Sequence, residues 1–234
     1  MSEKVAVVTG ASSGIGEAIA KRLLTLGYNV IGVSRGVSQT LIEKEKFQAM
    51  QVDLSSEKET LKLVETLKKL SPTLLVNSAG VGLFEPHEEL SVKSITSMTF
   101  LNLTAPMLLT NATLRALKQN SGYLININSI EALRASKFAG VYSATKAGLR
   151  AFSDSLFEET RRSELSITNI NPDMTESNFY NDLRFETSKK EDERLLCEDI
   201  ADAVEHIVSM RKGAVVSEYT IRSLKFGISK KKSN

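Results

Sequence analysis

The chain has little cysteine, no long apolar run and no strong excess of either charge. Its one cysteine, Cys197, has no partner for an internal disulfide, which fits a reducing compartment. The first residues lack the basic segment and longer apolar region of a signal peptide. We therefore expect a cytoplasmic protein.

A membrane-spanning helix is not expected, because it needs about 18 or more almost uninterrupted apolar residues. The 30 basic and 28 acidic side chains leave a formal charge of only +2, so the composition indicates neither a nucleic-acid nor a membrane partner. His87 and His206 have no second ligand at a useful spacing, and we predict no metal site. What is present is an ordinary globular composition, with 41% hydrophobic and 25% charged residues.

Short β-branched runs alternate along the chain with longer segments whose apolar residues recur at helical spacing. This alternation is typical of βαβ units and a parallel sheet. We predict one domain over residues 1–234, a doubly wound α/β sheet of the Rossmann type with about seven strands and helices on both faces. The predicted strands are Lys4–Thr9, Asn29–Ser34, Phe47–Asp53, Thr73–Asn77, Gly122–Asn128, Ser166–Asn171 and one within Val215–Ile221.

Two apolar stripes predict helices that face the sheet, and Gly27 directly after the first predicts its C-cap. The basic end of the chain, Lys230 to Lys232, is expected to be a solvated, disordered tail. The stripes consist of Ile15, Ile19, Leu23 and Leu26, and of Leu61, Val64, Leu67 and Leu70.

A glycine-rich turn joins the first predicted strand to the first predicted helix, with Gly10, Gly14 and Gly16 in the pattern G-x-x-x-G-x-G. Glycines let the backbone turn tightly and let a pyrophosphate approach, while the free N–H groups and dipole of a helix N-terminus favour negative charge. The turn therefore predicts a dinucleotide site. A tight strand-to-helix connection without a ligand is the alternative.

Residues 9–16 read T-G-A-S-S-G-I-G and resemble the T-G-x-x-x-G-I-G signature of the short-chain dehydrogenases/reductases. Asn77, Ser78, Ala79 and Gly80 stand where that family has N-N-A-G, with Ser78 replacing the second asparagine. The resemblance continues to about Ser177 and implies an oxidoreductase that binds NAD or NADP. Its implied cofactor-binding residues are Gly10, Ser12, Ser13, Gly14, Ile15, Gly16, Ser34, Arg35, Asp53, Leu54, Asn77, Ala79, Gly80, Tyr142, Lys146, Pro172, Thr175 and Ser177.

The choice of cofactor depends on the end of the second predicted strand, where the residues are Val33, Ser34 and Arg35. An NAD enzyme usually has an acidic side chain there for the ribose hydroxyls, whereas a basic one suits the 2′-phosphate of NADP. NADP is therefore favoured over NAD, although Arg35 as an unpartnered surface residue is the alternative. For Asp53, the resemblance implies a contact with the adenine amino group, and a turn aspartate is the alternative.

Tyr142 and Lys146 are four residues apart, which places them on one face of a helix. A nearby ammonium, helped by the positive charge of an oxidised nicotinamide, stabilises a phenolate and lowers the pKa of a tyrosine toward the range of a general acid or base. Ser129 precedes Tyr142 by thirteen residues, and Asn102 matches the family's helix asparagine. Alternatively, Ser129 caps a turn, Asn102 is a satisfied polar residue and the Y-x-x-x-K pair is only a helix surface.

The resemblance implies a role for each of these four side chains. Ser129 would bind the substrate oxygen, Tyr142 would give or take its proton, Lys146 would bind the nicotinamide ribose, and Asn102 would hold a water in the proton path. After Pro172, the family's P-G-x-V-x-T becomes Pro-Asp-Met-Thr-Glu-Ser, which departs from the pattern at positions 173 and 175. The polar segment 178–194 is a candidate substrate lid, and a flexible surface loop is its alternative.

The expected function is NADP-dependent hydride transfer to or from a small carbonyl or alcohol substrate. A catalytically silent protein of the same fold that senses the dinucleotide is the alternative. The resemblance also implies a homodimer or homotetramer, with the helices that carry Asn102 and Tyr142 at the interface.

Overall fold

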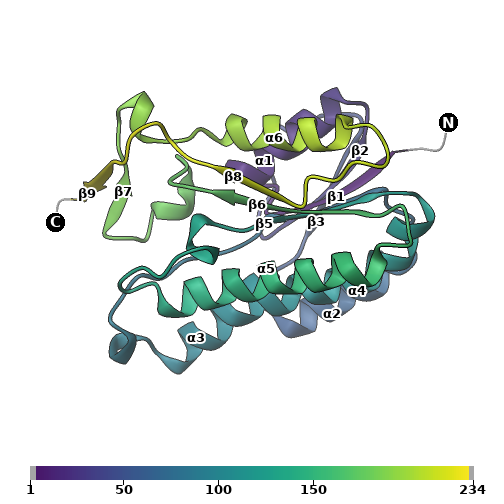
Figure 1. Ribbon diagram of the computed structural model, residues 1–234. Coiled ribbons are helices and arrows are strands. Elements are labelled where there is room, and N and C mark those ends of the chain that lie inside the picture. The colour runs from purple at the N-terminus through teal and green to yellow at the C-terminus, as the bar shows by residue number, and fades with distance from the viewer. Residues whose placement is uncertain (1–3, 232–234) are drawn as a thin grey trace.

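The computed structural model describes residues 4–231, in which a seven-stranded parallel sheet forms the centre of the molecule. The predicted doubly wound α/β fold is confirmed, and each predicted strand has a counterpart in the sheet (Figure 1). The strand order is β3-β2-β1-β4-β5-β6-β8. The strands are β1 Val5–Thr9, β2 Asn29–Ser34, β3 Phe47–Gln51, β4 Leu74–Asn77, β5 Tyr123–Ile127, β6 Ser166–Pro172 and β8 Glu218–Ile221.

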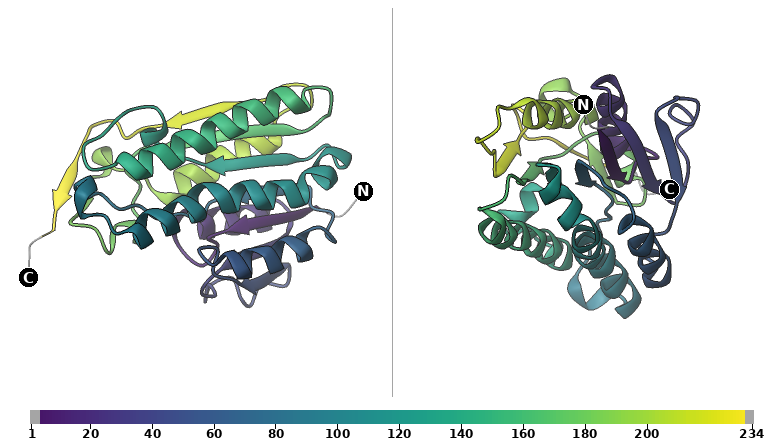
Figure 2. Two further views of the ribbon diagram at one scale, coloured as in Figure 1. Left: turned by 90° about the horizontal axis from the view of Figure 1, so that it is seen from below. Right: turned by 90° about the vertical axis from the view of Figure 1, so that its right-hand side faces the viewer.

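Helices cover both faces of this sheet. Figure 1 shows α1 and α6 on one face and α2, α4 and α5 on the other, and Figure 2 shows the same layers from below and from one end. Because both faces are covered, the central strands are buried on both sides and mostly apolar rather than alternating, and all four residues of β4 are buried. The helices are α1 Gly14–Thr25, α2 Glu57–Leu67, α3 Val92–Thr99, α4 Ala105–Gln119, α5 Gly140–Thr160 and α6 Cys197–Ser209.

The first helical stripe faces the core as predicted, with Ile19 and Leu23 fully buried, and Gly27 follows the helix at a φ of +83°. The second stripe was partly wrong, because Leu61 is 46% exposed. Steps of three residues turn by about 300°, so such a stripe drifts around an α-helix of 3.6 residues per turn. The buried face of α2 follows steps of three and four instead, through Thr60, Leu63, Val64 and Leu67.

A second, two-stranded sheet joins the predicted lid segment to the end of the chain. β7 (Phe185–Thr187) pairs antiparallel with β9 (Ile228–Lys230). The Nζ of Lys231 donates hydrogen bonds to the backbone carbonyls of Tyr180 and Asn181. The expectation of a disordered tail was therefore wrong for residues 230 and 231, while Lys232 lies outside the described residues.

The turn between β1 and α1 has no room for side chains at two of its glycines. Gly10 has a φ of +70°, which is the left-handed region that glycine adopts without strain. At Gly16, a Cβ atom would lie 2.3 Å from the carbonyl oxygen of Gly10. The close contact between the strand end and the first helical turn therefore requires glycine at position 16.

We predict that Gly16→Ala lowers the free energy of unfolding by about 1–3 kcal/mol, the usual cost of overpacking a tight site. Urea unfolding measures this change. Gly140→Ala is the matched control, because a Cβ at that helical glycine meets nothing within 4 Å. Equal stability of the two variants would show that the turn tolerates a side chain at Gly16.

Candidate functional site

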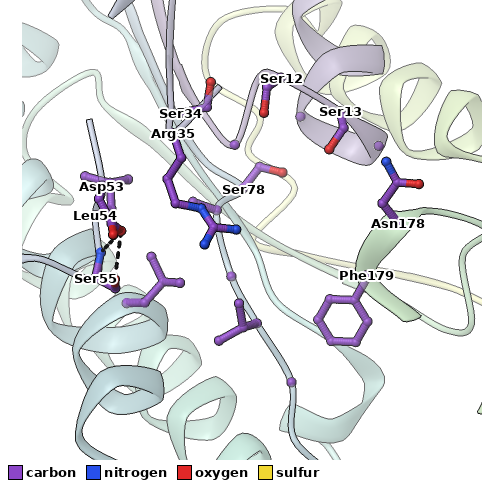
Figure 3. Close-up of a pocket in the computed structure, with 18 of the residues that line it drawn as sticks. Ser12, Ser13, Ser34, Arg35, Asp53, Leu54, Ser55, Ser78, Asn178 and Phe179 are labelled. Carbon is purple, nitrogen blue, oxygen red and sulfur yellow. Dashed lines mark hydrogen bonds between the residues drawn. The ribbon is translucent and has the colours of Figure 1, made fainter. Parts of the chain in front are cut away.

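A cavity of about 670 Å³ lies at the carboxyl ends of the parallel strands, beside the turn between β1 and α1 (Figure 3). In open α/β sheets, ligands bind where the strand order reverses, and here β1 and β4 are the neighbours at that point. Thirteen residues of the predicted cofactor set line this cavity: Gly10, Ser12, Ser13, Gly14, Ile15, Gly16, Ser34, Arg35, Asp53, Leu54, Ala79, Gly80 and Ser177.

The start of α1 faces this cavity and is suited to an anion. Ser13 caps the helix with an extended backbone, and its side chain makes no capping hydrogen bond. The first N–H groups of a helix lack partners inside the helix and carry partial positive charge. The glycines leave the backbone open to a close approach, so the residues present fit a dinucleotide pyrophosphate.

Arg35 extends into the cavity from the end of β2, as Figure 3 shows. The pKa of Asp53 is lowered: partial burial raises it, but hydrogen bonds from the hydroxyl and backbone N–H of Ser55, and to a smaller extent the charge of Arg35, lower it by more in total. The Oδ1 of Asp53 accepts these two bonds at 2.7 and 2.9 Å. The turn contacts expected in the alternative interpretation of Asp53 are therefore present, and the residue also lines the cavity.

A smaller cavity of about 90 Å³ adjoins the first, since Ile15, Gly80 and Phe179 line both. It brings together Ser129, Tyr142 and Lys146, the three predicted catalytic side chains with ionisable or hydroxyl groups. Ser129 follows β5, whereas the other two residues lie one turn apart on α5. The cofactor residues predicted from the later part of the chain also line it: Pro172, Thr175 and Ser177.

Ser129 and Lys146 are tied to their surroundings by hydrogen bonds. Ser129 and Tyr142 both line the smaller cavity, and the Ser129 side chain acts through hydrogen bonding to lower the pKa of Tyr142. Ser129 also accepts a bond from the backbone N–H of Glu131, so it caps the short 3₁₀ turn Ile130–Ala132 as the alternative interpretation expected. Lys146 donates from Nζ to the carbonyl of Ile127 at 2.9 Å. The helix α5 is thereby fixed against the end of β5.

Two predicted asparagines lie behind the cavities rather than on their walls. Asn102 is 1% exposed and exchanges two hydrogen bonds with the backbone of Val81, at 2.8 and 3.0 Å. It lies in a π-helical turn, Phe100–Thr104, between α3 and α4, a feature that occurs often at functional sites. Asn77 donates to Asn126 at 2.8 Å within a buried polar network. Both side chains position neighbouring segments in this structure.

Burial dominates the electrostatics of the smaller cavity. It raises the pKa of Tyr142 to about 12, with the nearby charge of Glu131 raising it further and the hydrogen bond with Ser129 lowering it. Burial also lowers the pKa of Lys146 to about 8, since desolvation disfavours the ammonium. In this structure burial thus outweighs the lowering of the tyrosine pKa that we expected from Lys146. The ammonium lies 5.9 Å from the centre of the tyrosine ring.

The segment after Pro172 adds residues that the sequence motifs did not single out. Asp173 stands where the family has glycine, and its side chain is 4% exposed and pairs with Arg222 at 3.3 Å. Phe179 and Tyr180, on a 3₁₀ turn of the predicted lid, line the smaller cavity together with Asp173. Two adjacent aromatic residues inside a polar segment were the signal in the sequence for this part of the site.

Comparison with known families gives a match over residues 4–187, most of the chain, to the short chain dehydrogenase family. The chain belongs to this family. An uncharacterized oxidoreductase of Staphylococcus epidermidis is 34% identical over 231 residues, covering 95% of this chain and 98% of that protein. A second one, from Staphylococcus saprophyticus, is 32% identical with the same coverage. As a short chain dehydrogenase, this protein is an oxidoreductase.

Solved structures agree with this assignment. An alcohol dehydrogenase of the archaeon Thermococcus sibiricus, in complex with 5-hydroxy-NADP, superposes with a TM-score of 0.85 at 27% identity. That match covers 95% of this chain and 97% of the archaeal one. A metagenomic short-chain oxidoreductase in complex with NADP gives a TM-score of 0.78 at 28% identity, covering 95% and 98%.

The described residues 4–231 contain no group of three or more His, Cys, Asp or Glu side chains able to hold a metal ion. Within the same residues, no helix has the length and apolar character needed to cross a membrane. Cys197 donates from Sγ to the carbonyl of Glu176, and burial raises its thiol pKa to about 11. This cysteine is therefore a half-buried thiol rather than a reactive one.

The lowered pKa of Lys146 predicts a specific dependence of stability on pH. Between about pH 8 and 10.5 the unfolded chain binds more protons at this position than the folded chain, so the stability of the parent rises with pH there. Lys146→Met removes the group. The stability advantage of the Met variant over the parent should shrink by up to about 3 kcal/mol from pH 7 to 10.5, measured by urea unfolding.

Lys118→Met, at an exposed position on α4, is the control for removing a lysine from a helix. Tyr142 also titrates in this range in the unfolded chain, near its ordinary pKa of 10, but the parent and Lys146→Met both contain it, so its contribution cancels in their difference. A constant difference between the parent and Lys146→Met would show that Lys146 titrates as an ordinary lysine.

Proposed function

We propose that this protein is an NADP-dependent oxidoreductase that transfers a hydride between the nicotinamide and a small carbonyl or alcohol substrate. The observation that carries the proposal is the buried Tyr142, which lines one small cavity together with Ser129 and Lys146, next to the larger cavity. The larger cavity would hold the adenosine and pyrophosphate, and the smaller one would hold the reacting groups. When bound, NADPH would supply the hydride that reduces the carbonyl carbon.

Four side chains of the site have separate roles in the proposed reaction. Ser129 donates a hydrogen bond to the substrate oxygen, and Tyr142 gives that oxygen its proton in reduction or removes it in oxidation. Its pKa of about 12 keeps the phenol protonated at neutral pH, which is the form needed for reduction. Lys146 binds the nicotinamide ribose, and Asn102 positions a water for the return of the proton. The water would be held by the backbone of the π-helical turn that contains Asn102, because the Asn102 side chain is already hydrogen bonded to the backbone of Val81.

The preference for NADP rests on Arg35, which extends into the larger cavity with no carboxylate beside it on β2. A guanidinium suits a phosphate because it donates bidentate, charge-assisted hydrogen bonds. The archaeal alcohol dehydrogenase and the metagenomic oxidoreductase, both similar to this chain, are complexed with NADP compounds. The lid role of residues 178–194 and assembly as a homodimer or homotetramer remain proposals.

Tyr142→Phe tests the assignment of the proton donor. The ring and its packing remain, but the ionisable hydroxyl is lost, so turnover of a carbonyl substrate should fall by about 10²- to 10⁴-fold. NADPH oxidation is followed with a panel of aldehydes, ketones and diketones. NADPH affinity and melting temperature should stay close to those of the parent.

Tyr219→Phe is the matched control, because it removes a hydroxyl from a half-buried tyrosine on β8, outside both cavities. It should leave turnover unchanged. Near-parental turnover by a folded Tyr142→Phe variant would remove Tyr142 as the acid. A parent that binds NADPH but turns over no member of the panel would favour the silent sensor instead.

Arg35→Ala tests the choice of cofactor. Loss of a charge-assisted contact worth roughly 1.5–3 kcal/mol should raise the NADPH dissociation constant about ten- to a hundredfold. NADH binding should change little, because NADH has no 2′-phosphate. Fluorescence titration measures both constants, with the exposed Arg115→Ala on α4 as the control. Equal weakening of NADPH and NADH would refute the phosphate role.

A further inference from the structure

Five aromatic side chains form a closed ring of contacts that includes the proposed proton donor. Each ring contacts the next, with centroid separations between 5.2 and 5.9 Å, and the last contacts the first. The members, in order around the ring, are Phe84, Tyr142, Phe179, Tyr180 and Phe185. We call this set the aromatic ring cluster. It combines the loop after β4, helix α5, the 3₁₀ turn Asn178–Tyr180 and strand β7.

Three members of the aromatic ring cluster, Tyr142, Phe179 and Tyr180, line the smaller cavity, and Phe84 and Phe185 pack against them without lining it. Tyr142 is buried, but the other four members are only half-buried and so keep part of their apolar surface uncovered. Phe179 lines both cavities. A substrate oxygen that reaches the hydroxyl of Tyr142 places its carbonyl carbon next to a ring that already contacts Phe84 and Phe179. The substituents on that carbon must therefore meet aromatic surface.

The charged side chains around the smaller cavity disfavour an anionic substrate. Of the described residues that line it, Lys146 is the one basic side chain, and it is engaged with a backbone carbonyl and, in the proposed function, with the cofactor. Two acidic side chains, Asp173 on the cavity wall and Glu131 near Tyr142, add no attraction for an anion. A substrate carboxylate would lose water there without gaining a free cation.

The same carboxylates do not make a site for a cationic substrate. Asp173 is paired with Arg222 at 3.3 Å and accepts a bond from the backbone N–H of Met174 at 3.0 Å. Glu131 is paired with Arg134 at 2.8 Å. With their charges already balanced, these groups leave the aromatic surface as the feature of the cavity that selects a substrate.

We infer that the substrates are neutral aldehydes or ketones that carry an aromatic or similarly bulky apolar substituent on the carbonyl carbon. This inference rests on the proposed function and specifies its substrate class. The aromatic ring cluster provides the specificity, and the roles of Ser129 and Tyr142 in proton transfer are unchanged by it.

Three ketones that differ in one property each test the inference with the full-length enzyme and NADPH. Ethyl benzoylformate and benzoylformate share the phenyl ketone and differ in charge, whereas ethyl benzoylformate and ethyl pyruvate are both neutral and differ in the ring. The kcat/KM for ethyl benzoylformate should be at least about ten times that for ethyl pyruvate, which is the effect of one good apolar contact. It should also be at least about ten times that for benzoylformate, which is the effect of one unpaired buried charge.

Phe179→Leu, on the wall of both cavities, tests whether the aromatic ring cluster determines this preference. The variant should reduce the preference for ethyl benzoylformate over ethyl pyruvate by about threefold or more, mainly through KM, because an aromatic contact is worth roughly 0.5–1.5 kcal/mol beyond its area. Phe157→Leu is the matched control. It changes another half-buried phenylalanine, 15 residues beyond Tyr142 on α5 and therefore about 22 Å away.

The outcomes separate this inference from the proposed function. Reduction of ethyl pyruvate or benzoylformate at least as efficiently as ethyl benzoylformate overturns the inference and leaves the proposed function standing. An equal fall in kcat for both esters in Phe179→Leu also overturns it, because the ring would then only position Tyr142. If an enzyme that binds NADPH reduces none of the three ketones, the proposed function fails as well.

Discussion

The order of the strands on the two sides of β1 determines where this protein can hold a ligand. β2 and β3 lie on one side, and β4, β5, β6 and β8 lie on the other, so the connections after β1 and β4 leave toward opposite faces of the sheet. The crevice between them is held by Thr9, whose Oγ1 accepts bonds from the N–H groups of Ser78 and Ala79 at 2.9 and 3.0 Å. A Cβ at Gly10 would lie 3.1 Å from the backbone of Ala79, so the close approach of these two segments at the bottom of the crevice favours glycine at position 10.

The second cavity depends on how α5 is fixed to the sheet beside that crevice. The bond from Lys146 to the carbonyl of Ile127 joins the helix to the end of β5. Ser129 follows the same strand two residues later, and Tyr142 lies one helical turn before the lysine. A helix that presented another face to β5 would separate the hydroxyls of Ser129 and Tyr142. The spacing of four residues thus has a structural and a chemical consequence at once.

The large sheet was predictable from the sequence because its central strands are short, mostly apolar runs that alternate with helical stripes, a pattern typical of a parallel sheet covered on both faces. The small sheet was not. β7 and β9 have three residues each, with polar side chains among them, and lie about 40 residues apart, so their pairing depends on contacts that no local pattern encodes. The aromatic ring cluster could not be predicted from the sequence for the same reason, because Phe84 and Phe185 come into contact only in the folded chain. The motif residues were recognisable because their spacing is local, as at Tyr142 and Lys146.

Burial shifts the two ionisable groups of the site in opposite directions, and both shifts favour the uncharged form. The pKa of Tyr142 rises to about 12 and that of Lys146 falls to about 8. Without other charges, the tyrosine is therefore protonated at neutral pH and a poor base. Oxidation of an alcohol needs the phenolate, so it needs an additional positive charge next to the ring. An oxidised nicotinamide would carry that charge and a reduced one would not, so the cofactor's redox state would itself select whether Tyr142 gives or takes the proton.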